Sequence, residues 1–303
     1  MARWFFASIR WGLGLCALAL MLAALYVSLG RQLVPLVAEY RLEAEDKARA
    51  ALGMPLEIGR LEGHWQGFAP VLIAHDVLVG EGPSALRLDQ IRVVPDMLAS
   101  LLTGQPRLAQ LELEGVQLSV LQDPQGAWTL KGLPQRSETG GVDPQQVLTQ
   151  LQAVSRLSLL NSQVTLEAHG HPAQTFTYVN LTLGNGARRQ RVDARLLLPD
   201  GQPVALQLRT RLSAENWRNS AAELYLSLPQ SDWARWLPPS LTRAWRLEQL
   251  EAGGEVWLSW AKGAVQRAVS RLHAPQVSAA YAQREAVQLQ DVAVNAYFTR
   301  KKQ

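Results

Sequence analysis

The first pattern along the chain is an uninterrupted apolar run near its start. Residues 11–30 carry no charged side chain. An α-helix of this length rises about 30 Å, which is the thickness of the hydrocarbon core of a bilayer. We therefore predict a membrane-spanning helix over residues 11–30. Trp4, Trp11 and Tyr26 would lie near its ends, at the membrane interface, where aromatic rings are enriched.

A cleavable signal peptide is the alternative interpretation of this run. The apolar core of a signal peptide spans only about 7 to 15 residues, and Val27–Gly30 makes a poor cleavage site. We therefore predict that the helix is retained as an anchor. Arg3 and Arg10 precede the run, whereas only Arg31 follows it directly. This bias predicts a cytoplasmic tail over residues 1–10, with the long remainder of the chain translocated.

The second pattern, over residues 31–53, has a helical period. Apolar residues recur every three or four positions, and charged residues occupy much of the remaining surface. This arrangement is typical of an amphipathic helix, which Gly53 is expected to end. Its solvated face is expected to carry the acidic residues Glu43, Glu45 and Asp46.

From Met54 onward the period changes to two, which is typical of strands with one apolar and one polar face. Val192–Leu198 alternates up to a Pro-Asp-Gly-Gln turn at residues 199–202, and Val204–Leu208 alternates away from it. This pair of runs predicts an antiparallel hairpin. The expected fold is mainly β with helices: an elongated, curled antiparallel sheet over residues 54–303, interrupted by short helices.

Two kinds of irregularity interrupt the alternation. At Gly115 the apolar positions change phase, which indicates a bulge or a tight corner between two halves of a strand. Short helices are predicted at residues 96–102, 143–154 and 231–236.

The alternation leaves open what the apolar face of the sheet packs against. In a compact domain this face meets a second layer and closes a dry core. A long sheet with few helices could instead curl and leave its apolar face lining a groove, for which acyl chains are natural occupants, because large exposed apolar patches usually mark binding surfaces. Periodicity does not separate the two. The residues assigned to this groove or core face are Leu111, Leu113, Val116, Leu118, Val120, Leu196, Leu198, Leu206 and Leu208.

Composition and charge exclude several classes of protein. With 48% hydrophobic and 18% charged residues, the chain is not intrinsically disordered. Its single cysteine, Cys16, excludes an intramolecular disulfide and a Cys-rich zinc site. Subtracting the six basic residues that flank the apolar run or end the chain from the net charge of +4 leaves −2. The body therefore lacks the basic surface that nucleic-acid phosphates require, and no nucleic-acid partner is expected.

Residues that could carry catalysis or hold a metal are few. His169 and His171 offer two imidazoles without a third ligand, so a plain loop is the preferred interpretation. His64 and His75 are interpreted as ordinary strand residues. The sequence contains neither a Gly-x-Ser-x-Gly motif nor a phosphate-binding Gly-x-x-x-x-Gly-Lys loop. We therefore predict a protein that is not an enzyme and that uses no metal or cofactor of its own.

The segment that follows the anchor and the amphipathic helix carries a family resemblance. It resembles the start of the YhdP branch of the AsmA-like envelope proteins, and the Leu-x-Leu-x-Gly-Val-x-Leu pattern at residues 111–118 is similar to strands of that family. The similarity is clearest over the first 125 residues or so and contains no catalytic residue. The small and aromatic residues that carry it are Gly59, Gly63, Trp65, Gly67, Phe68 and Pro70.

The resemblance implies a protein of the Gram-negative inner membrane, with one membrane span and its body in the periplasm. It implies an elongated β-groove that conducts phospholipid toward the outer membrane. The implied partners are phospholipid acyl chains, the inner membrane, and either other envelope proteins or a missing continuation, because members of this branch are several times longer. The chain is therefore expected to be incomplete at its C-terminus. The glycines are expected to permit sharp strand bends, with Trp65 and Phe68 filling the core or the membrane end of the groove.

An alternative interpretation keeps the anchor and the β-rich body but closes the core. The chain would then be a membrane-tethered scaffold that binds other envelope proteins.

Overall fold

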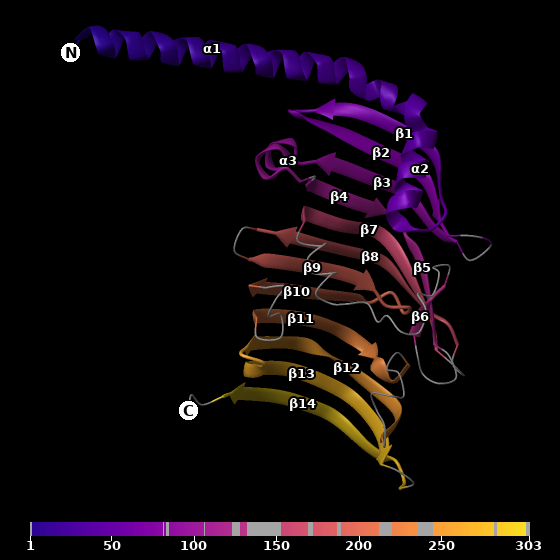
Figure 1. The fold of residues 1–303 in the computed structure, drawn as a ribbon. Coiled ribbons are helices and arrows are strands. Elements are labelled where there is room, and N and C mark those ends of the chain that lie inside the picture. Colours follow the sequence, from indigo (N-terminus) through magenta and orange to yellow (C-terminus); the bar gives the residue numbers. More distant parts are fainter. Residues whose placement is uncertain are drawn as a thin grey trace.

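An N-terminal helix extends away from one long curved sheet in the computed structural model (Figure 1). The structure describes residues 2–80, 82, 85–105, 107–122, 128–131, 153–168, 172–186, 189–211, 220–235, 245–281 and 284–300. The helices before the sheet are α1 (Ala2–Leu33), the 3-10 helix η1 (Val34–Tyr40) and α2 (Arg41–Leu52).

Helix α1 contains the predicted membrane span and continues beyond both of its ends. Among the described residues, one helical stretch is long and apolar enough to cross a membrane, and its most apolar part is not buried in the protein. The helix predicted over residues 31–53 is divided, which corrects the sequence-based expectation. Pro35 lies at the start of η1 and has no N–H group to continue the hydrogen bonds of α1. Helix α2 then runs to Gly53, where an end was predicted.

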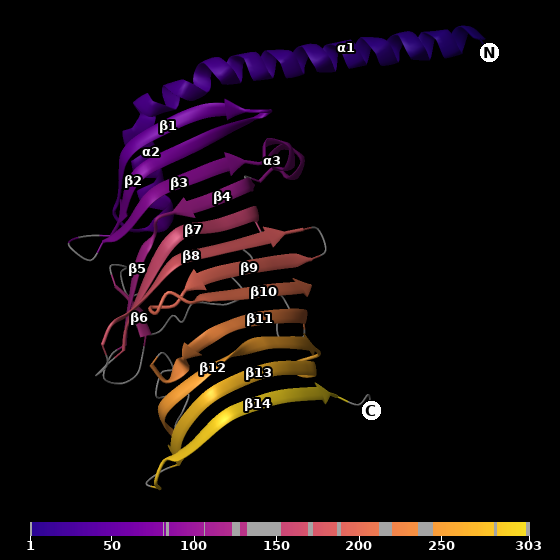
Figure 2. The ribbon, with the colours of Figure 1, turned by 180° about the vertical axis from the view of Figure 1, so that it is seen from behind.

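All fourteen described strands belong to one sheet, as Figures 1 and 2 show from opposite sides. The strands are β1 (Leu56–Gln66), β2 (Ala69–Val79), β3 (Leu86–Pro95), β4 (Leu108–Glu114), β5 (Gln117–Gln122), β6 (Trp128–Leu130), β7 (Val154–Glu167), β8 (Gln174–Asn185), β9 (Gln190–Leu197), β10 (Pro203–Arg211), β11 (Ala221–Asp232), β12 (Trp245–Ala261), β13 (Ala264–Tyr281) and β14 (Val287–Thr299).

The strands follow one another almost in chain order, so the sheet grows away from α1 as the sequence proceeds. The order is β1-β2-β3-β4-β7-β8-β9-β10-β11-β12-β13-β14, with β5 and β6 beside this path. The mainly β fold is confirmed, with one correction to the antiparallel expectation: β4 and β5 both pair with β7 in parallel. After β6 the chain returns so that β7 lies beside β4 and β5 and runs in the same direction as both. The connection between β6 and β7 is therefore a crossover, unlike the hairpin that joins two antiparallel strands.

The predicted interruptions of the sheet have different outcomes. Helix α3 (Met97–Thr103) confirms the first short helix, and the hairpin between β9 and β10 is also confirmed. Residues 143–152 of the second predicted helix lie outside the described residues, and Val154 begins β7. Within the described part of the third, residues 231–235, β11 extends to Asp232 and the single turn η4 (Trp233–Arg235) follows; residue 236 lies outside the described residues.

A line of backbone irregularities crosses the first half of the sheet. Gly115 has a φ of 67°, and the neighbouring strands carry Asp76 with a φ of 53° and Asn161 with a φ of 48°. Asp and Asn adopt this left-handed conformation more readily than most residues other than glycine. At Gly115 a side chain would also overlap the carboxylate of Asp89 in β3. The predicted corner at Gly115 is therefore confirmed, and it is one part of a bend shared by several strands.

Polar side chains satisfy backbone groups that the bend removes from the strand ladder. The Val116 N–H donates to the Ser162 hydroxyl at 3.2 Å, and the Asn161 N–H donates to the Asn180 side-chain oxygen at 3.0 Å. Unpaired buried backbone groups are costly, so these side chains allow the sheet to bend without losing that energy.

The bend keeps the apolar side chains on one face. In a regular strand, residues an odd number of positions apart point to opposite faces. Leu113 and Val116, on either side of the bend, nevertheless belong to one hydrophobic cluster, as do Ile58 and Leu61. The phase change in the sequence therefore compensates for the change of direction in the backbone.

The strand registers align residues of successive strands, all of them apolar except Ser270, into two continuous rows across this face. The first row consists of Leu72, Val93, Leu111, Leu157, Leu183, Val192, Leu208, Leu224, Leu258, Ala268 and Phe298. The second row consists of Leu61, Ala74, Ile91, Leu113, Leu159, Leu181, Ala194, Leu206, Leu226, Val256, Ser270 and Ala296.

The buried core lies where η1 and α2 cover this apolar face. Val37 of η1 and Ala44 and Ala48 of α2 pack against a cluster formed mainly by the first three strands. The buried members of the cluster are Leu56, Ile58, Leu61, Val77, Val79, Leu88 and Val116.

Candidate functional site

The two rows are only partly covered along almost their whole length: Leu61 in β1 is buried, and the members in β2 to β4 are already half-buried. From β7 to β13 every member of both rows is half-buried, and in β14 the members are exposed, with Phe298 at 52%. The opposite face of the same strands is mostly polar, and in β9 it carries the charged residues Arg191, Asp193 and Arg195. The apolar face is therefore a strip that runs through eight successive strands, β7 to β14, without full burial.

The junction between α1 and the first hairpin lies at the β1 end of the apolar face. The Trp65 ring packs across Gly30 and meets the Tyr26 ring edge-on, with 5.1 Å between ring centroids. The Tyr26 hydroxyl donates to the Phe68 carbonyl oxygen at 3.2 Å. A side chain at Gly63 would overlap the Val34 carbonyl oxygen, so η1 can cross β1 closely only because residue 63 is glycine.

Glu45 links α2 to β1 through hydrogen bonds. This corrects the expectation that Glu45 lies on a solvated face. It is 4% exposed, and its carboxylate accepts a hydrogen bond from the Ile58 N–H at 3.0 Å. Arg41 and Arg49, one helical turn on either side, donate to the same carboxylate at 2.6 and 3.3 Å. The spacing of four residues between each arginine and Glu45 was the signal in the sequence that indicates this cluster. Glu43 and Asp46 are exposed, as expected.

The YhdP protein family model matches residues 1–303. The chain belongs to the YhdP family. It is 25% identical over 258 residues to the intermembrane phospholipid transporter YhdP of Escherichia coli (strain K12), and the alignment covers 82% of this chain. It covers 19% of that relative, so the chain spans about a fifth of the relative's length. No solved structure matches the chain.

The structure brings together some of the residues assigned to the apolar face and separates others. Leu111 and Leu208 lie in the first row, and Leu113 and Leu206 lie in the second. Leu196 pairs with Val204 next to these rows. The remaining members lie in the core cluster, on β5 or before the β9–β10 turn; they are Val116, Leu118, Val120 and Leu198.

The residues of the YhdP-like signature gather around the first hairpin. Gly67 and Phe68 form the turn between β1 and β2, and Pro70 pairs with Trp65 directly beside it. A side chain at Gly59 would come within 2.9 Å of the Asp76 Cβ, on the line where the sheet bends. The signature thus lies where α1 and η1 join the sheet and where β1 and β2 bend. Among the interface aromatics, Trp11 is exposed on α1, and for Trp4 the structure describes the backbone alone.

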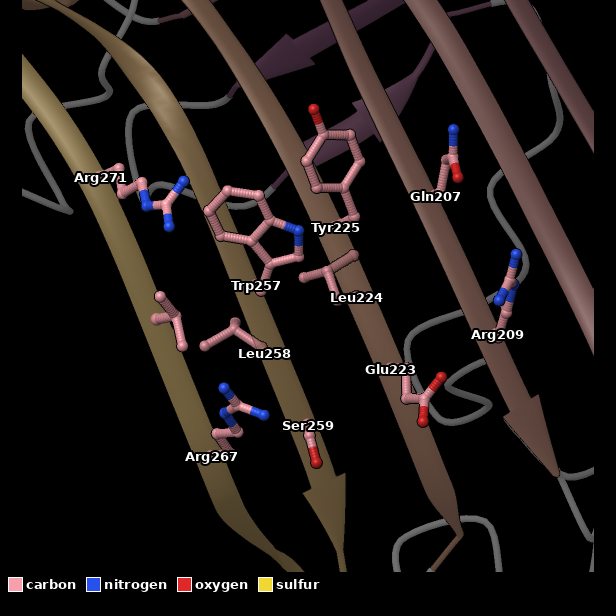
Figure 3. Close-up of a pocket in the computed structure, with 11 residues that line it drawn as sticks. Gln207, Arg209, Glu223, Leu224, Tyr225, Trp257, Leu258, Ser259, Arg267 and Arg271 are labelled. Atoms are coloured by element: carbon pink, nitrogen blue, oxygen red, sulfur yellow. The ribbon is translucent and has the colours of Figure 1, made fainter. Parts of the chain in front are cut away.

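A shallow pocket on the opposite, polar face lies over β10 to β13 (Figure 3). The Trp257 ring lies between Tyr225, at 5.5 Å between centroids, and the guanidinium group of Arg271, at 5.6 Å. The Tyr225 hydroxyl donates to Glu255 at 2.7 Å, and this hydrogen bond raises the pKa of Tyr225 above its usual value. These side chains bond mainly to one another across the strands, which stabilises the polar face.

The histidines show no metal-binding arrangement within the part of the chain that the structure describes. His64 and His75 lie in β1 and β2, and no group of three His, Cys, Asp or Glu residues suited to a metal occurs among the described residues. His169 and His171 lie outside the described residues. The apolar strip is therefore the candidate functional site.

Proposed function

We propose that this chain is the membrane-anchored N-terminal part of a phospholipid-transport protein, in which the curved apolar face forms a groove that shields acyl chains. The continuity of the two rows across the sheet supports this most directly. Exposed apolar surface costs about 25 cal/mol for each Å², so a half-buried strip of leucine and valine is favourably covered by hydrocarbon. Acyl chains would lie along the rows while their headgroups stay in water, and transfer would need no covalent chemistry.

The anchor sets the proposed location. Residues 1–10 would form a cytoplasmic tail, residues 11–30 would cross the inner membrane, and residues 31–53 would join the anchor to the sheet. Residues 54–303 would then lie in the periplasm. Twelve strands side by side, at about 4.8 Å each, extend about 50 Å. A continuation of the sheet beyond β14, or another envelope protein, would be needed to carry lipid farther.

Photo-crosslinking in intact cells tests the groove. A benzophenone side chain replaces Leu208, in the first row, or its neighbour Gln207, which lies on the opposite face and is the matched control. In cells grown with radioactive phosphate, irradiation is expected to label the Leu208 variant with phospholipid and to leave the Gln207 variant unlabelled. Equal labelling of both variants, or of neither, would reject the proposal.

The scaffold with a closed core remains the second candidate, because α2 does close a core over the first strands. In that case the Leu208 variant would crosslink to protein or to its own chain. Mass spectrometry of the purified full-length chain in detergent adds an independent measure. A groove is expected to retain phospholipid in at least equimolar amount, whereas a closed core retains only lipid that exchanges freely with detergent.

A further inference from the structure

Helix α3 presents its large apolar side chains away from the sheet. Four of its seven residues are large, apolar and exposed, and Leu101 reaches 82% exposure. Residues three to four positions apart lie on one side of a helix, so these four side chains form a single outward face. They are Met97, Leu98, Leu101 and Leu102.

The polar groups of α3 are bonded to its own backbone or to the segment before β4. Asp96 caps the helix by accepting a hydrogen bond from the Ala99 N–H at 2.9 Å. The Ser100 hydroxyl accepts from the Arg107 N–H at 2.9 Å, and the Thr103 hydroxyl donates to the Ala99 carbonyl oxygen at 2.7 Å. The bond between Ser100 and Arg107 joins the helix to the residue just before β4, while the large apolar side chains stay exposed, which is the reverse of an ordinary surface helix.

A second exposed apolar side chain lies at the same edge of the sheet. Helix α3 joins β3 to β4 at the edge where Phe68 forms the β1–β2 turn, and Phe68 is 74% exposed. Both views show α3 and this turn on the side toward which α1 runs to its N-terminus (Figures 1 and 2). Tyr26, which bonds the Phe68 carbonyl, lies four residues before Gly30, or about 6 Å back along α1. The turn therefore reaches beside the end of the proposed membrane span.

We propose that α3 and the tip of the β1–β2 turn insert into the leaflet that faces the body of the protein, beside the anchor. The inference rests on the proposed membrane span of residues 11–30. The apolar face of α3 would replace water with acyl chains, and the exposed Arg107 beside it suits the anionic headgroup phosphates. The first row begins near this edge, at Leu72 and Val93. Insertion would therefore bring the start of the row to the leaflet from which lipid enters.

Fluorescence of single cysteine probes tests this contact in the full chain. Cys16 is the only cysteine, so Cys16→Ser gives a background for Leu101→Cys, Phe68→Cys and the control Gln288→Cys at the far end of the sheet. Each cysteine carries a nitrobenzoxadiazole probe, and each protein is reconstituted in phosphatidylethanolamine–phosphatidylglycerol vesicles. The probes at residues 101 and 68 are expected to be quenched by spin-labelled lipid and to be several-fold less accessible to aqueous iodide than the probe at residue 288.

Three outcomes would overturn the inference. Equal access of iodide to all three probes would place α3 in water. The probe at residue 101 could be shielded from iodide without quenching by spin-labelled lipid, which would indicate a protein partner or a second copy. It could also respond to the spin-labelled lipid no more than the control probe does. Alkaline extraction of the same vesicles separately tests whether the chain is inserted through its membrane span. A failure of the membrane span can therefore be distinguished from a failure of α3 insertion.

Discussion

The two ends of the apolar face have the same sequence pattern but different surroundings. At the first strands, η1 and α2 cover the face, and Val77 is completely buried. Within the rows themselves Leu61 is the one buried member; the members in β2 to β13 are half-buried, and in β14 Phe298 keeps 52% of its surface in contact with solvent. Alternation of apolar and polar residues therefore specifies which face is apolar without specifying what covers that face.

The difference assigns separate roles to the two regions. The covered end contains the buried charge cluster around Glu45 and the buried cluster under α2, which are features that give a rigid domain its stability. The later strands are stabilised by their ladders and by pairs on the polar face, such as Tyr225 with Glu255. A rigid end joined to an incompletely covered strip is the arrangement that the proposed lipid groove requires.

The largest loss of stability is expected when a charge is introduced into the covered end of the sheet. Val77→Asp places a carboxylate where no water reaches and should destabilise the chain by about 4 kcal/mol or more. Denaturant unfolding of the detergent-solubilised chain, followed by tryptophan fluorescence, measures this loss. Leu78→Asp, at the next position and on the opposite side of β2, is the control and should cost less than half as much. Equal losses would mean that α2 does not create a distinct core.

Removal of the Glu45 carboxylate ranks second. Glu45→Ala leaves the Ile58 N–H and two guanidinium groups without their shared acceptor, and the expected loss is about 3 kcal/mol. The same unfolding measurement applies. Glu43→Ala, on the exposed side of α2, should change the free energy of unfolding by less than about 0.5 kcal/mol. A comparable loss in both variants would contradict the role of Glu45 as the link between α2 and β1.

The crossing of η1 over β1 ranks third. Gly63→Ala forces the Val34 carbonyl away from the strand and should cost about 2 kcal/mol, in the range of overpacked sites. Gly14→Ala on α1 meets no atom within 4 Å and serves as the matched glycine change, with no measurable effect on unfolding of the sheet. A neutral Gly63→Ala variant would show that η1 does not pack closely on β1.

Much of this fold follows from local pattern, and the missing parts have physical reasons. The anchor, the strands and the corner at Gly115 follow from residue types and periodicity. The bend at Asn161 was visible as the same phase change between Leu159 and Val164, but only a glycine was interpreted as a corner, although Asn also adopts positive φ. The parallel pairing of β4 with β7 depends on where the chain returns after a crossover, which alternation does not encode. For the candidate site, the pattern predicted an apolar face but not how much of it helices cover.

The last prediction compares the two ends directly. Leu206→Asp puts a carboxylate into the second row, where the side chain is half-buried and water reaches the charge, so the expected loss is about 1 kcal/mol, well below that of Val77→Asp. Gln207→Asp, its neighbour on the polar face, should cost still less. Unfolding of the delipidated chain isolates the effect of the new carboxylate on the free energy of unfolding, because bound lipid would add its own stabilisation to the folded state. A loss at Leu206 as large as that at Val77 would mean that the later rows are also sealed, and the proposed groove would then be a second closed core.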